Sequence, residues 1–484
     1  MKRKSAYLII NPRSDKIDKL AAMLSVFSAA GWKTDIAIKE YGGHTRRLAK
    51  KAAKAGYDFV IGYGGDGTIN QVVNGVVAAK RRRCIVGAIP GGTANVWAHE
   101  IGMADDAVKG ALALINSEGR KVDLGHVQVD PPPVSGATRN RSRRPPLESG
   151  GRHHFLLMAG LGIDAAILRR VSTPLKEKMG EVAVAVAAVT VVPTHHKFPI
   201  EISAAAVGKK KAARWKGEAL QVIVGNTRRY GNIAEVTPDA FIDDGVLDVC
   251  VITAGEPLST VKQILSILLN RDPVHGRSEY FQSAHIEISV PPSVRLQLDG
   301  SPVKRKDYET AAARKTESGA TASVVTYRFD AMPRALPVAI PRTYGGALFE
   351  AVAGKEATPP AGKTQSGQVA VPAPRRQSRT GSRHSAEQID ALVKEGRKVT
   401  VIGVSPNRQR RGSYVVAGEG EAKKKGDSQP VAVRIDGTTT LLTQAGAPLP
   451  ATATATLKEG GVIVVDGKQS KRGVIRAKHV VVMD

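Results

Sequence analysis

The sequence predicts an α/β domain with a mostly parallel sheet, followed by a β-rich domain and by a small, separate all-β domain. Strand-like and helix-like patterns alternate over the first 120 residues, which is typical of a parallel sheet. Strand-like runs then dominate over 155–329, and five more follow a segment rich in Pro, Gly, Gln and Ser. We therefore expect domains at 1–125, 126–345 and 390–484, with a basic linker at 351–385.

The first domain is expected to contain four strands, each followed by a helix. In the first helix Leu20, Leu24 and Phe27 recur at helical spacing, and Gly31 ends it. The expected strands are 6–10, 34–39, 59–62 and 84–89, and the later helices are 44–55, 68–80 and 104–117.

The second domain is expected to consist mainly of strands. Clear examples are 220–225, 246–252, 286–290 and 294–298, and two apolar helices are expected at 181–192 and 258–270. Before them, 131–152 is rich in Pro, Gly, Ser and Arg and has almost nothing to bury, so we interpret it as a mobile basic insertion.

The C-terminal domain is expected to be a small barrel, and an OB-like fold is one candidate. Its five expected strands are 398–404, 413–417, 431–435, 462–465 and 474–482. Two Asp-Gly pairs, at Asp436-Gly437 and Asp466-Gly467, are typical of turns between strands.

The composition indicates an acidic partner or an anionic surface. The net charge is +27 and the pI is near 10.1, and such a charge favours association with anions. Aromatic residues make up only 4% of the chain, which disfavours a nucleic-acid site built on base stacking. The longest apolar run, at 182–192, is shorter than the ~20 residues that span a bilayer, and the apolar run before Asn11 is too short for a secretion signal.

A glycine-rich motif, GGDGTINQVVNG from Gly64 to Gly75, follows the apolar strand. Glycines let main-chain N–H groups approach an anion, and a helix that begins near Thr68 directs its positive end toward that anion. Asp66 lies among these donors, where a carboxylate suits a metal or a hydroxyl better than a phosphate. The motif therefore predicts a nucleotide site.

Two further polar motifs also follow predicted strands. They are NPRS, which begins at Asn11, and PGGTANVWA at 90–98. Since the carboxyl ends of parallel strands meet at one edge of a sheet, all three motifs are expected at the edge where such folds bind ligands.

In this order, the motifs resemble the catalytic domain of the diacylglycerol-kinase family, which includes bacterial diacylglycerol kinases, related phosphatidylglycerol kinases and sphingosine kinases. The resemblance extends over 5–345 and continues in DLG at 123–125, in AGLGIDA at 159–165 and in 224–249. NAD kinases are more distantly similar through the GGDG element. The resemblance implies that ATP phosphorylates a lipid hydroxyl in a cleft between the first two domains.

The same resemblance implies which residues hold ATP and Mg²⁺. The ATP-binding positions would be Asn11, Gly64, Gly65, Asp66, Gly67, Thr68, Gly92, Thr93 and Asn95. Mg²⁺ would be bound by the Asp244 carboxylate and by the main-chain carbonyls of Phe241 and Val246, which are the hard oxygen ligands that this ion prefers. Asp66 is also expected to take part in catalysis.

The sequence departs from the family pattern at two positions. Val96 stands where many members have an acid, although sphingosine-kinase-like members are also apolar there. Ser301 follows Asp299-Gly300 where the family has a glutamate, the expected proton acceptor, and serine has no useful basicity near pH 7. Three explanations stay open: Asp299 is the base, the substrate or a water supplies the acceptor, or the chain is catalytically impaired.

These observations predict a Mg²⁺- and ATP-dependent lipid kinase, a transferase of lipid metabolism that acts on a diacylglycerol or a sphingoid-type lipid. The alternative is an impaired pseudokinase or scaffold that binds nucleotide or lipid. The expected location is cytoplasmic, in peripheral contact with the anionic inner membrane face. The expected partners are the lipid alcohol and that surface, nucleic acid is disfavoured, and a homodimer is one candidate for the oligomeric state.

Overall fold

The computed structural model describes residues 3–12, 19–79, 83–130, 153–162, 197–208, 212–230, 234–253, 278–303, 324–350, 384–407, 409, 412–421, 428–470 and 473–483. The chain forms two compact units. The first combines Met1–Leu20 with Trp32–Phe349, and the second combines Ala21–Gly31 with Glu350–Asp484.

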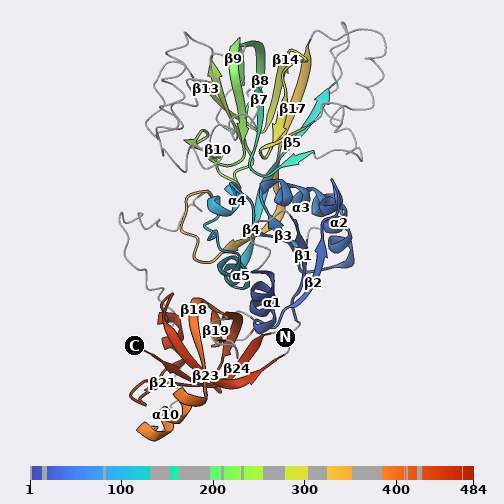
Figure 1. Ribbon diagram of the computed structural model, residues 1–484. Coiled ribbons are helices and arrows are strands. Elements are labelled where there is room, and N and C mark those ends of the chain that lie inside the picture. Colours follow the sequence, from blue (N-terminus) through green and yellow to red (C-terminus); the bar gives the residue numbers. More distant parts are fainter. Residues whose placement is uncertain are drawn as a thin grey trace. The chain divides into compact units, whose positions relative to one another are not determined.

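The first unit begins with the predicted parallel sheet (Figure 1). Four parallel strands lie in the order β4-β3-β1-β2. They are β1 (Ser5–Ile10), β2 (Lys33–Ile38), β3 (Phe59–Gly64) and β4 (Ile85–Pro90). Every residue of β3 is buried, as expected for a central strand of a parallel sheet that is covered on both faces.

The helices that follow these strands place the candidate motifs. They are α2 (His44–Ala55), α3 (Asp66–Ala78), α4 (Val96–Glu100) and α5 (Ala107–Ile115). Helix α1 (Leu20–Ala29), which follows β1 along the chain, belongs to the second unit from Ala21 onward. Helices α2 and α3 pack side by side at Gly75, where a Cβ would lie 2.5 Å from the carbonyl oxygen of Arg46 (Figure 1). Glycine at this position lets the two helices approach closely.

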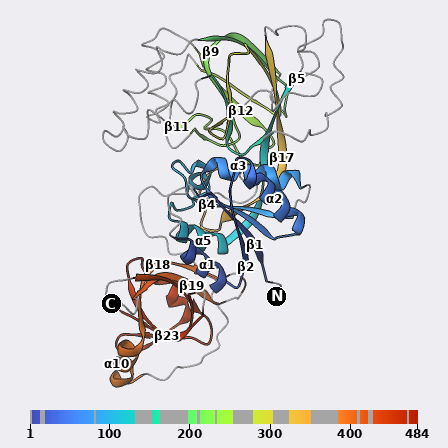
Figure 2. The same ribbon diagram turned by 45° about the vertical axis from the view of Figure 1, so that its right-hand side comes forward.

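Two long strands connect the α/β lobe to the β-rich lobe of the same unit (Figures 1 and 2). They are β5 (Ser117–Asp130) and β17 (Val325–Pro341), which pair antiparallel along almost their whole length. The register shifts between Met332 and Leu336, a β-bulge that bends the pair. Beyond the bulge, β17 also pairs in parallel with β4. The predicted boundary between residues 125 and 126 therefore falls inside one continuous strand.

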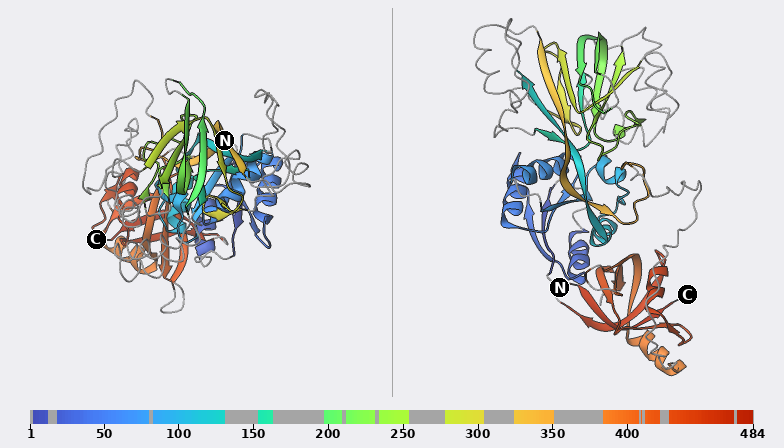
Figure 3. Two further views of the ribbon diagram at one scale, coloured as in Figure 1. Left: turned by 90° about the horizontal axis from the view of Figure 1, so that it is seen from above. Right: turned by 180° about the vertical axis from the view of Figure 1, so that it is seen from behind.

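The β-rich lobe, whose strands are seen in two further views in Figure 3, has its own apolar core. Its strands are β6 (His154–Phe155), β7 (Met158–Gly162), β8 (Phe198–Ala204), β9 (Ala213–Gly225), β12 (Leu247–Thr253), β13 (Ser278–Ser283), β14 (His285–Val290), β15 (Leu296–Leu298) and β16 (Ser301–Pro302), with a short pair β10 (Arg229–Tyr230) and β11 (Ala234–Glu235). Side chains such as Val224, Leu247, Ile288 and Phe329 face this core, and the alternating burial of β8 and β14 is typical of sheets with one wet face.

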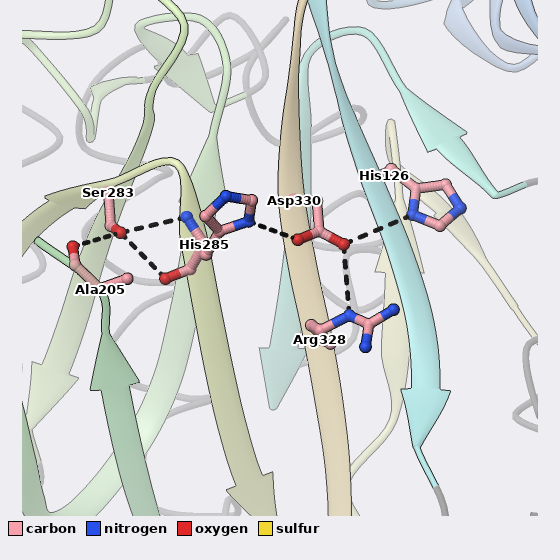
Figure 4. Close-up of polar contacts among 6 residues, drawn as sticks. All are labelled: His126, Ala205, Ser283, His285, Arg328 and Asp330. Carbon is pink, nitrogen blue, oxygen red and sulfur yellow. Dashed lines mark hydrogen bonds and ion pairs between the residues drawn. The ribbon is translucent and has the colours of Figure 1, made fainter. Parts of the chain in front are cut away.

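A row of polar side chains crosses the outer face of this lobe (Figure 4). Asp330 on β17 is paired in register with His126 on β5 and with His285 on β14. The Nδ1 atom of His285 lies 2.7 Å from Oδ1 of Asp330, and Nε of Arg328 lies 3.3 Å from Oδ2. Burial opposes ionisation of Asp330, but the imidazole of His126 at 3.9 Å, the hydrogen bond from His285 and the charge of Arg328 lower its pKa to about 2.

We expect the Asp330→Asn variant to be less stable than the wild type at neutral pH, by about 2 kcal/mol. Since the pKa of Asp330 is lowered, its contribution is complete above about pH 4 and is lost as the pH falls toward about 2. Denaturant unfolding of both proteins between pH 7 and pH 2 would measure the difference. The control is Asp105→Asn, at an exposed Asp–His pair, and a difference that does not shrink below pH 4 would contradict the assignment.

The second unit contains a β-barrel (Figure 3). Its strands are β18 (Arg397–Pro406), β19 (Tyr414–Glu421), β20 (Ser428–Ile435), β23 (Val462–Gln469) and β24 (Val474–Val482), with β21 (Thr440–Thr443) and β22 (Pro448–Leu449) beside them. Pairing runs β20-β19-β18-β23-β24 and returns from β24 to β20, so five strands form a closed ring. All five predicted strands are confirmed.

One helix covers part of the barrel. Helix α10 (Ala386–Glu395) begins with a complete capping box at Ser385 and Gln388, and Ile389 packs against Leu442 and Val464. The short 3-10 helix η4 (Ala451–Thr456) precedes β23.

Several local predictions are corrected by the structure. Helix α3 begins two residues before the predicted start at Thr68, and α5 is shorter than predicted. Asp436-Gly437 is a turn, but Asp466-Gly467 lies at a register shift inside β23. The predicted helices at 181–192 and 258–270 and the insertion at 131–152 lie outside the described residues, as does most of the linker.

Candidate functional site

The first glycine loop lies where β3 passes into α3. Gly65 is the N-cap of α3, and the Thr68 amide donates to the Gly65 carbonyl at 2.8 Å. Asn11, at the end of the neighbouring strand β1, donates from Nδ2 to Oγ1 of Thr68 at 3.3 Å. Asn11, the first residue of NPRS, and the GGDGT motif therefore meet at one edge of the sheet, at the positive end of a 13-residue helix, while Arg13 and Ser14 lie outside the described residues.

The second glycine loop lies against the first. A Cβ on Gly92 would be 2.5 Å from the Cα atom of Gly65, so the two backbones touch. The side chain of Asn95 closes this loop, since its Oδ1 accepts from the Gly92 amide at 2.9 Å and its Nδ2 donates to the Gly92 carbonyl at 2.7 Å. Asn95 has a φ of 49° and is the N-cap of α4. Thr93 is exposed on this turn.

Asp66 links the two loops. Its carboxylate accepts hydrogen bonds from the amides of Val96 at 3.1 Å and Trp97 at 3.0 Å, at the start of α4. Burial raises the pKa of Asp66, while these two amides oppose that rise. Asp66 thus joins α3 to α4, which is a contact that the sequence interpretation, with its emphasis on a metal or a hydroxyl, did not include.

The β-rich lobe brings a third segment to the same place. Ser301 begins β16, directly after the turn at Asp299 and Gly300, and both turn residues have positive φ values, 45° and 70°. A Cβ on Gly67 would lie 3.1 Å from Oγ of Ser301, so this hydroxyl is next to the first turn of α3. The residue at the family's glutamate position is therefore beside the glycine loop.

Asp299 occupies a different environment from Ser301. Its side chain is buried, and its carboxylate accepts hydrogen bonds from three main-chain amides at 156–158 and from Nδ2 of Asn70. A carboxylate that accepts four protein donors has little capacity to accept a proton from a substrate. The interpretation of Asp299 as the base is not supported by these contacts.

The predicted magnesium loop is anchored by Asp123, in the DLG motif on β5. The Asp123 carboxylate accepts from the Gly245 amide at 2.6 Å and from the Arg334 amide, which belongs to the β17 bulge. Oδ1 of Asp244 accepts from the Val246 amide at 3.1 Å. Burial raises the pKa of Asp123, and the two amides oppose the rise.

The donor set of this loop fits Mg²⁺. The Asp244 carboxylate is partly exposed, Phe241 and Val246 contribute carbonyl oxygens two or three residues away, and Gly245 has a φ of 80° that bends the chain. Oxygen ligands and open positions for water suit this ion. Within the described ranges no three His, Cys, Asp or Glu side chains form a metal-binding group, so a bound ion would depend on the carbonyl oxygens.

Helix α4 connects the glycine loops to the segment that leads into the magnesium loop. Its first turn is capped by Asp66, and Oε1 of Glu100 at its last residue accepts from the Arg229 amide at 2.7 Å. The guanidinium of the adjacent Arg228 donates from Nε to the Ala240 carbonyl at 3.0 Å and lies 5.0 Å from the ring centre of Phe241.

Hydrogen bonds between these segments involve three polar residues to which the sequence interpretation gave no role. Asn70 and Asn74 are inside the GGDGTINQVVNG motif, and Asp123 is inside DLG, but none of them was assigned a role. For Asn70 and Asn74 the sequence does contain a signal. Two asparagines at positions i and i+4 lie on the same face of a helix, and they need polar partners when that face is buried. Those partners come from a distant part of the chain and are not visible in the local pattern.

No helix in the part of the chain that the structure describes is both long and apolar enough to cross a membrane.

Comparisons with known proteins agree with the geometry. Residues 5–127 match the model of the diacylglycerol kinase catalytic domain, and residues 158–307 match that of the YegS C-terminal NAD kinase beta sandwich-like domain. The chain is 28% identical over 302 residues to a diacylglycerol kinase of Bacillus subtilis, which covers 61% of this chain and 89% of that protein. It is 27% identical over 344 residues to a probable lipid kinase YegS-like protein of Pseudomonas fluorescens, which covers 70% of this chain and 97% of that protein.

Solved structures share the fold. A putative diacylglycerol kinase from Bacillus anthracis superposes with a TM-score of 0.51 at 20% identity, covering 71% of this chain and 98% of that one. The two matched domains hold the glycine loops and the Asp299–Ser301 turn described above. Over these domains the chain belongs to the family of diacylglycerol kinases and YegS-like lipid kinases.

Proposed function

We propose that this lipid kinase transfers the γ-phosphoryl group of ATP, with Mg²⁺, to the hydroxyl of a diacylglycerol or a sphingoid-type lipid. The observation that carries the proposal is the meeting of three segments. The backbones of Gly65 and Gly92 touch at the start of α3, and the hydroxyl of Ser301 from the other lobe lies beside Gly67. A phosphate-binding helix end next to a group from the substrate lobe is what phosphoryl transfer requires.

The roles of the residues follow from their positions. The main-chain amides of the first turn of α3, with Asn11, Thr68 and the Gly92 loop, would bind the ATP phosphates. Asp244, with the carbonyls of Phe241 and Val246, would hold Mg²⁺, which neutralises charge on the phosphates when bound. Ser301 would donate a hydrogen bond to the acceptor oxygen or to a water, because a loose transition state depends more on positioning than on a strong base.

The membrane surface in this proposal is inferred from the charge of the chain. The net charge of +27 supports peripheral association with an anionic membrane surface, where a lipid alcohol is available. The pseudokinase alternative has less support, because the curated relatives compared above are named as kinases.

We expect Mg²⁺-dependent transfer of radiolabelled phosphate from ATP to one lipid class in a panel of diacylglycerol, sphingosine and phosphatidylglycerol. The transfer should disappear in Asp66→Ala, because this change releases α4 from α3. Gly42→Ala is the matched control, since a Cβ there meets no atom within 4 Å. Intact ATP binding with no transfer to any lipid would support the scaffold alternative instead.

The role of Ser301 is tested by Ser301→Glu, which restores the family residue. We expect the variant to shift the pH dependence of kcat, because a glutamate titrates in the acidic range and serine does not. A large gain in kcat would indicate that the serine site is impaired, whereas a loss would indicate a site adapted to serine. Equal pH profiles for both proteins would exclude Ser301 from the proton-transfer step.

We also propose that the C-terminal barrel is OB-like. Its closed ring joins the strands in the order β18-β19-β20-β24-β23, in which the last two have changed places relative to the chain. Such a five-stranded Greek-key ring is characteristic of OB barrels. An experimental structure in which β20 and β24 do not pair would contradict this assignment.

A further inference from the structure

Helix α3 carries two buried asparagines one turn apart, and both bond to the β-rich lobe. Nδ2 of Asn70 donates to Oδ2 of Asp299 at 2.7 Å and to the His154 carbonyl at 3.0 Å. Asn74 donates to the same carbonyl at 2.9 Å, and its Oδ1 accepts from the His154 amide at 3.1 Å. Both asparagine side chains thus form hydrogen bonds with the lobe that carries Ser301.

Asp299 is the centre of these contacts. Besides the bond from Asn70, its carboxylate accepts from the amides of Leu156 at 3.0 Å, Leu157 at 2.9 Å and Met158 at 3.1 Å. Its own amide donates to the Met158 carbonyl at 2.9 Å. The carboxylate therefore fixes the start of β7 and the turn before β16 to each other and to α3.

The turn after Asp299 is held in an unusual backbone conformation. Asp299 itself has a φ of 45°, a left-handed value that costs energy for a residue other than glycine and persists only where surrounding contacts enforce it. The four hydrogen bonds to its carboxylate provide that enforcement. Ser301 lies two residues after Asp299. The position of its side chain therefore depends on the direction in which the chain leaves this turn.

We propose that Asn70 and Asp299 form a positioning pair that fixes Ser301 against the first turn of α3, and thereby sets the distance between the bound phosphates and the lipid hydroxyl. The inference rests on the proposed kinase function. Helix α3 then has two roles. Its first turn binds phosphate, and Asn70, one helical turn later, holds the Asp299–Gly300 turn that positions Ser301. Neither residue of the pair needs to touch the substrate.

The pair has a titration signature that a purely structural contact lacks. Burial raises the pKa of Asp299 to about 6, and hydrogen bonds from Leu156 and Asn70, then from Leu157 and Met158, oppose the rise. Loss of the Asn70 donor should raise this pKa further. The other titratable group beside the pair is His154, whose pKa burial lowers well below its ordinary value. The imidazoles of His126 and His153 and the guanidinium of Arg46 act on His154 in the same direction.

The test compares Asn70→Ala with Asn74→Ala. The two variants remove the same kind of side chain from the same helix, and both lose a bond to the His154 carbonyl. Asn74→Ala also removes the 3.3 Å bond from Nδ2 of Asn74 to Oδ1 of Asn70, but only Asn70→Ala removes the donor to Asp299. We expect Asn70→Ala to lower kcat by roughly tenfold to a hundredfold, to leave the affinity for Mg-ATP within about twofold of wild type, and to move the acidic limb of the kcat profile to higher pH. Asn74→Ala should keep the wild-type profile.

A second readout is independent of catalysis. A buried carboxyl with a raised pKa makes the folded state less stable as the pH rises through that pKa. The melting temperature of Asn70→Ala should therefore fall increasingly below wild type between pH 5 and pH 8, whereas the difference for Asn74→Ala should stay constant. Identical pH dependence of both variants in melting and in kcat would overturn the positioning pair. Absence of lipid phosphorylation by the wild type, with the melting difference present, would overturn only the proposed function.

Discussion

Gly92→Ala is expected to weaken ATP binding and lipid phosphorylation by about a hundredfold or more. The new Cβ would lie 2.5 Å from Cα of Gly65 and 2.9 Å from its amide nitrogen, well inside van der Waals contact. Both neighbours are backbone atoms, so no side chain can rotate away. The loops must separate, and the N-terminal turn of α3 then loses the geometry that binds phosphate.

Titration calorimetry with Mg-ATP measures this effect directly, with phosphate transfer as a second readout. A hundredfold loss corresponds to about 2.7 kcal/mol, which lies within the usual range of about 1–3 kcal/mol for overpacking. Gly42→Ala controls for the intrinsic effect of replacing a glycine, since nothing lies within 4 Å of the added methyl group. If Gly92→Ala bound ATP as the wild type does, the contact between the two loops would not belong to the nucleotide site.

Asp299→Asn is expected to be the most destabilising of the conservative changes in this site. An asparagine would turn one oxygen acceptor into an NH₂ donor, which would face the Leu156 amide and the Asn70 amide group. Leaving buried donors unpaired costs about 1–3 kcal/mol each, so we expect a loss on the order of 3 kcal/mol in the free energy of unfolding, with loss of activity as the Ser301 turn loosens.

Urea unfolding of wild type and variant, followed by near-UV circular dichroism, provides the measurement. Asp105→Asn again serves as control, because the Asp105 side chain is 59% exposed and such surface changes are usually within about 0.5 kcal/mol. An unchanged midpoint for Asp299→Asn would mean that the four hydrogen bonds do not depend on the charge. If Asp299→Asn kept the wild-type urea midpoint but lost activity, the result would support Asp299 as the base.

Much of the fold could be predicted because local pattern and global structure agree. Apolar runs predict the strand at 59–62, which the structure extends to Gly64, and they also predict the five barrel strands. The pairing of the two strands that connect the lobes could not be predicted. Strand β5 continues through the DLG motif, and its partner β17 lies about 200 residues later in the chain, so no local pattern describes their pairing.

The candidate site was predictable where the chemistry is carried by short motifs. Glycine loops after parallel strands predict a phosphate site, because few other structures need those residues there. The distinction between Asp299 and Ser301 was not available from the sequence. Both are polar residues in one tight turn, and only the structure shows that the first faces the interior while the second lies beside Gly67.

The pairing of β17 with β4 has a consequence for the order of folding. Val338 pairs with Val86, so the sheet that begins with the first residues of the chain acquires its last strand only after residue 341 has been synthesised. Until then β4 is an open edge, which can pair with another chain. A ribosome-bound fragment that ends near residue 130 should therefore contain the glycine loops and still be prone to aggregation. Completion of the α/β lobe must wait for the whole β-rich lobe to emerge.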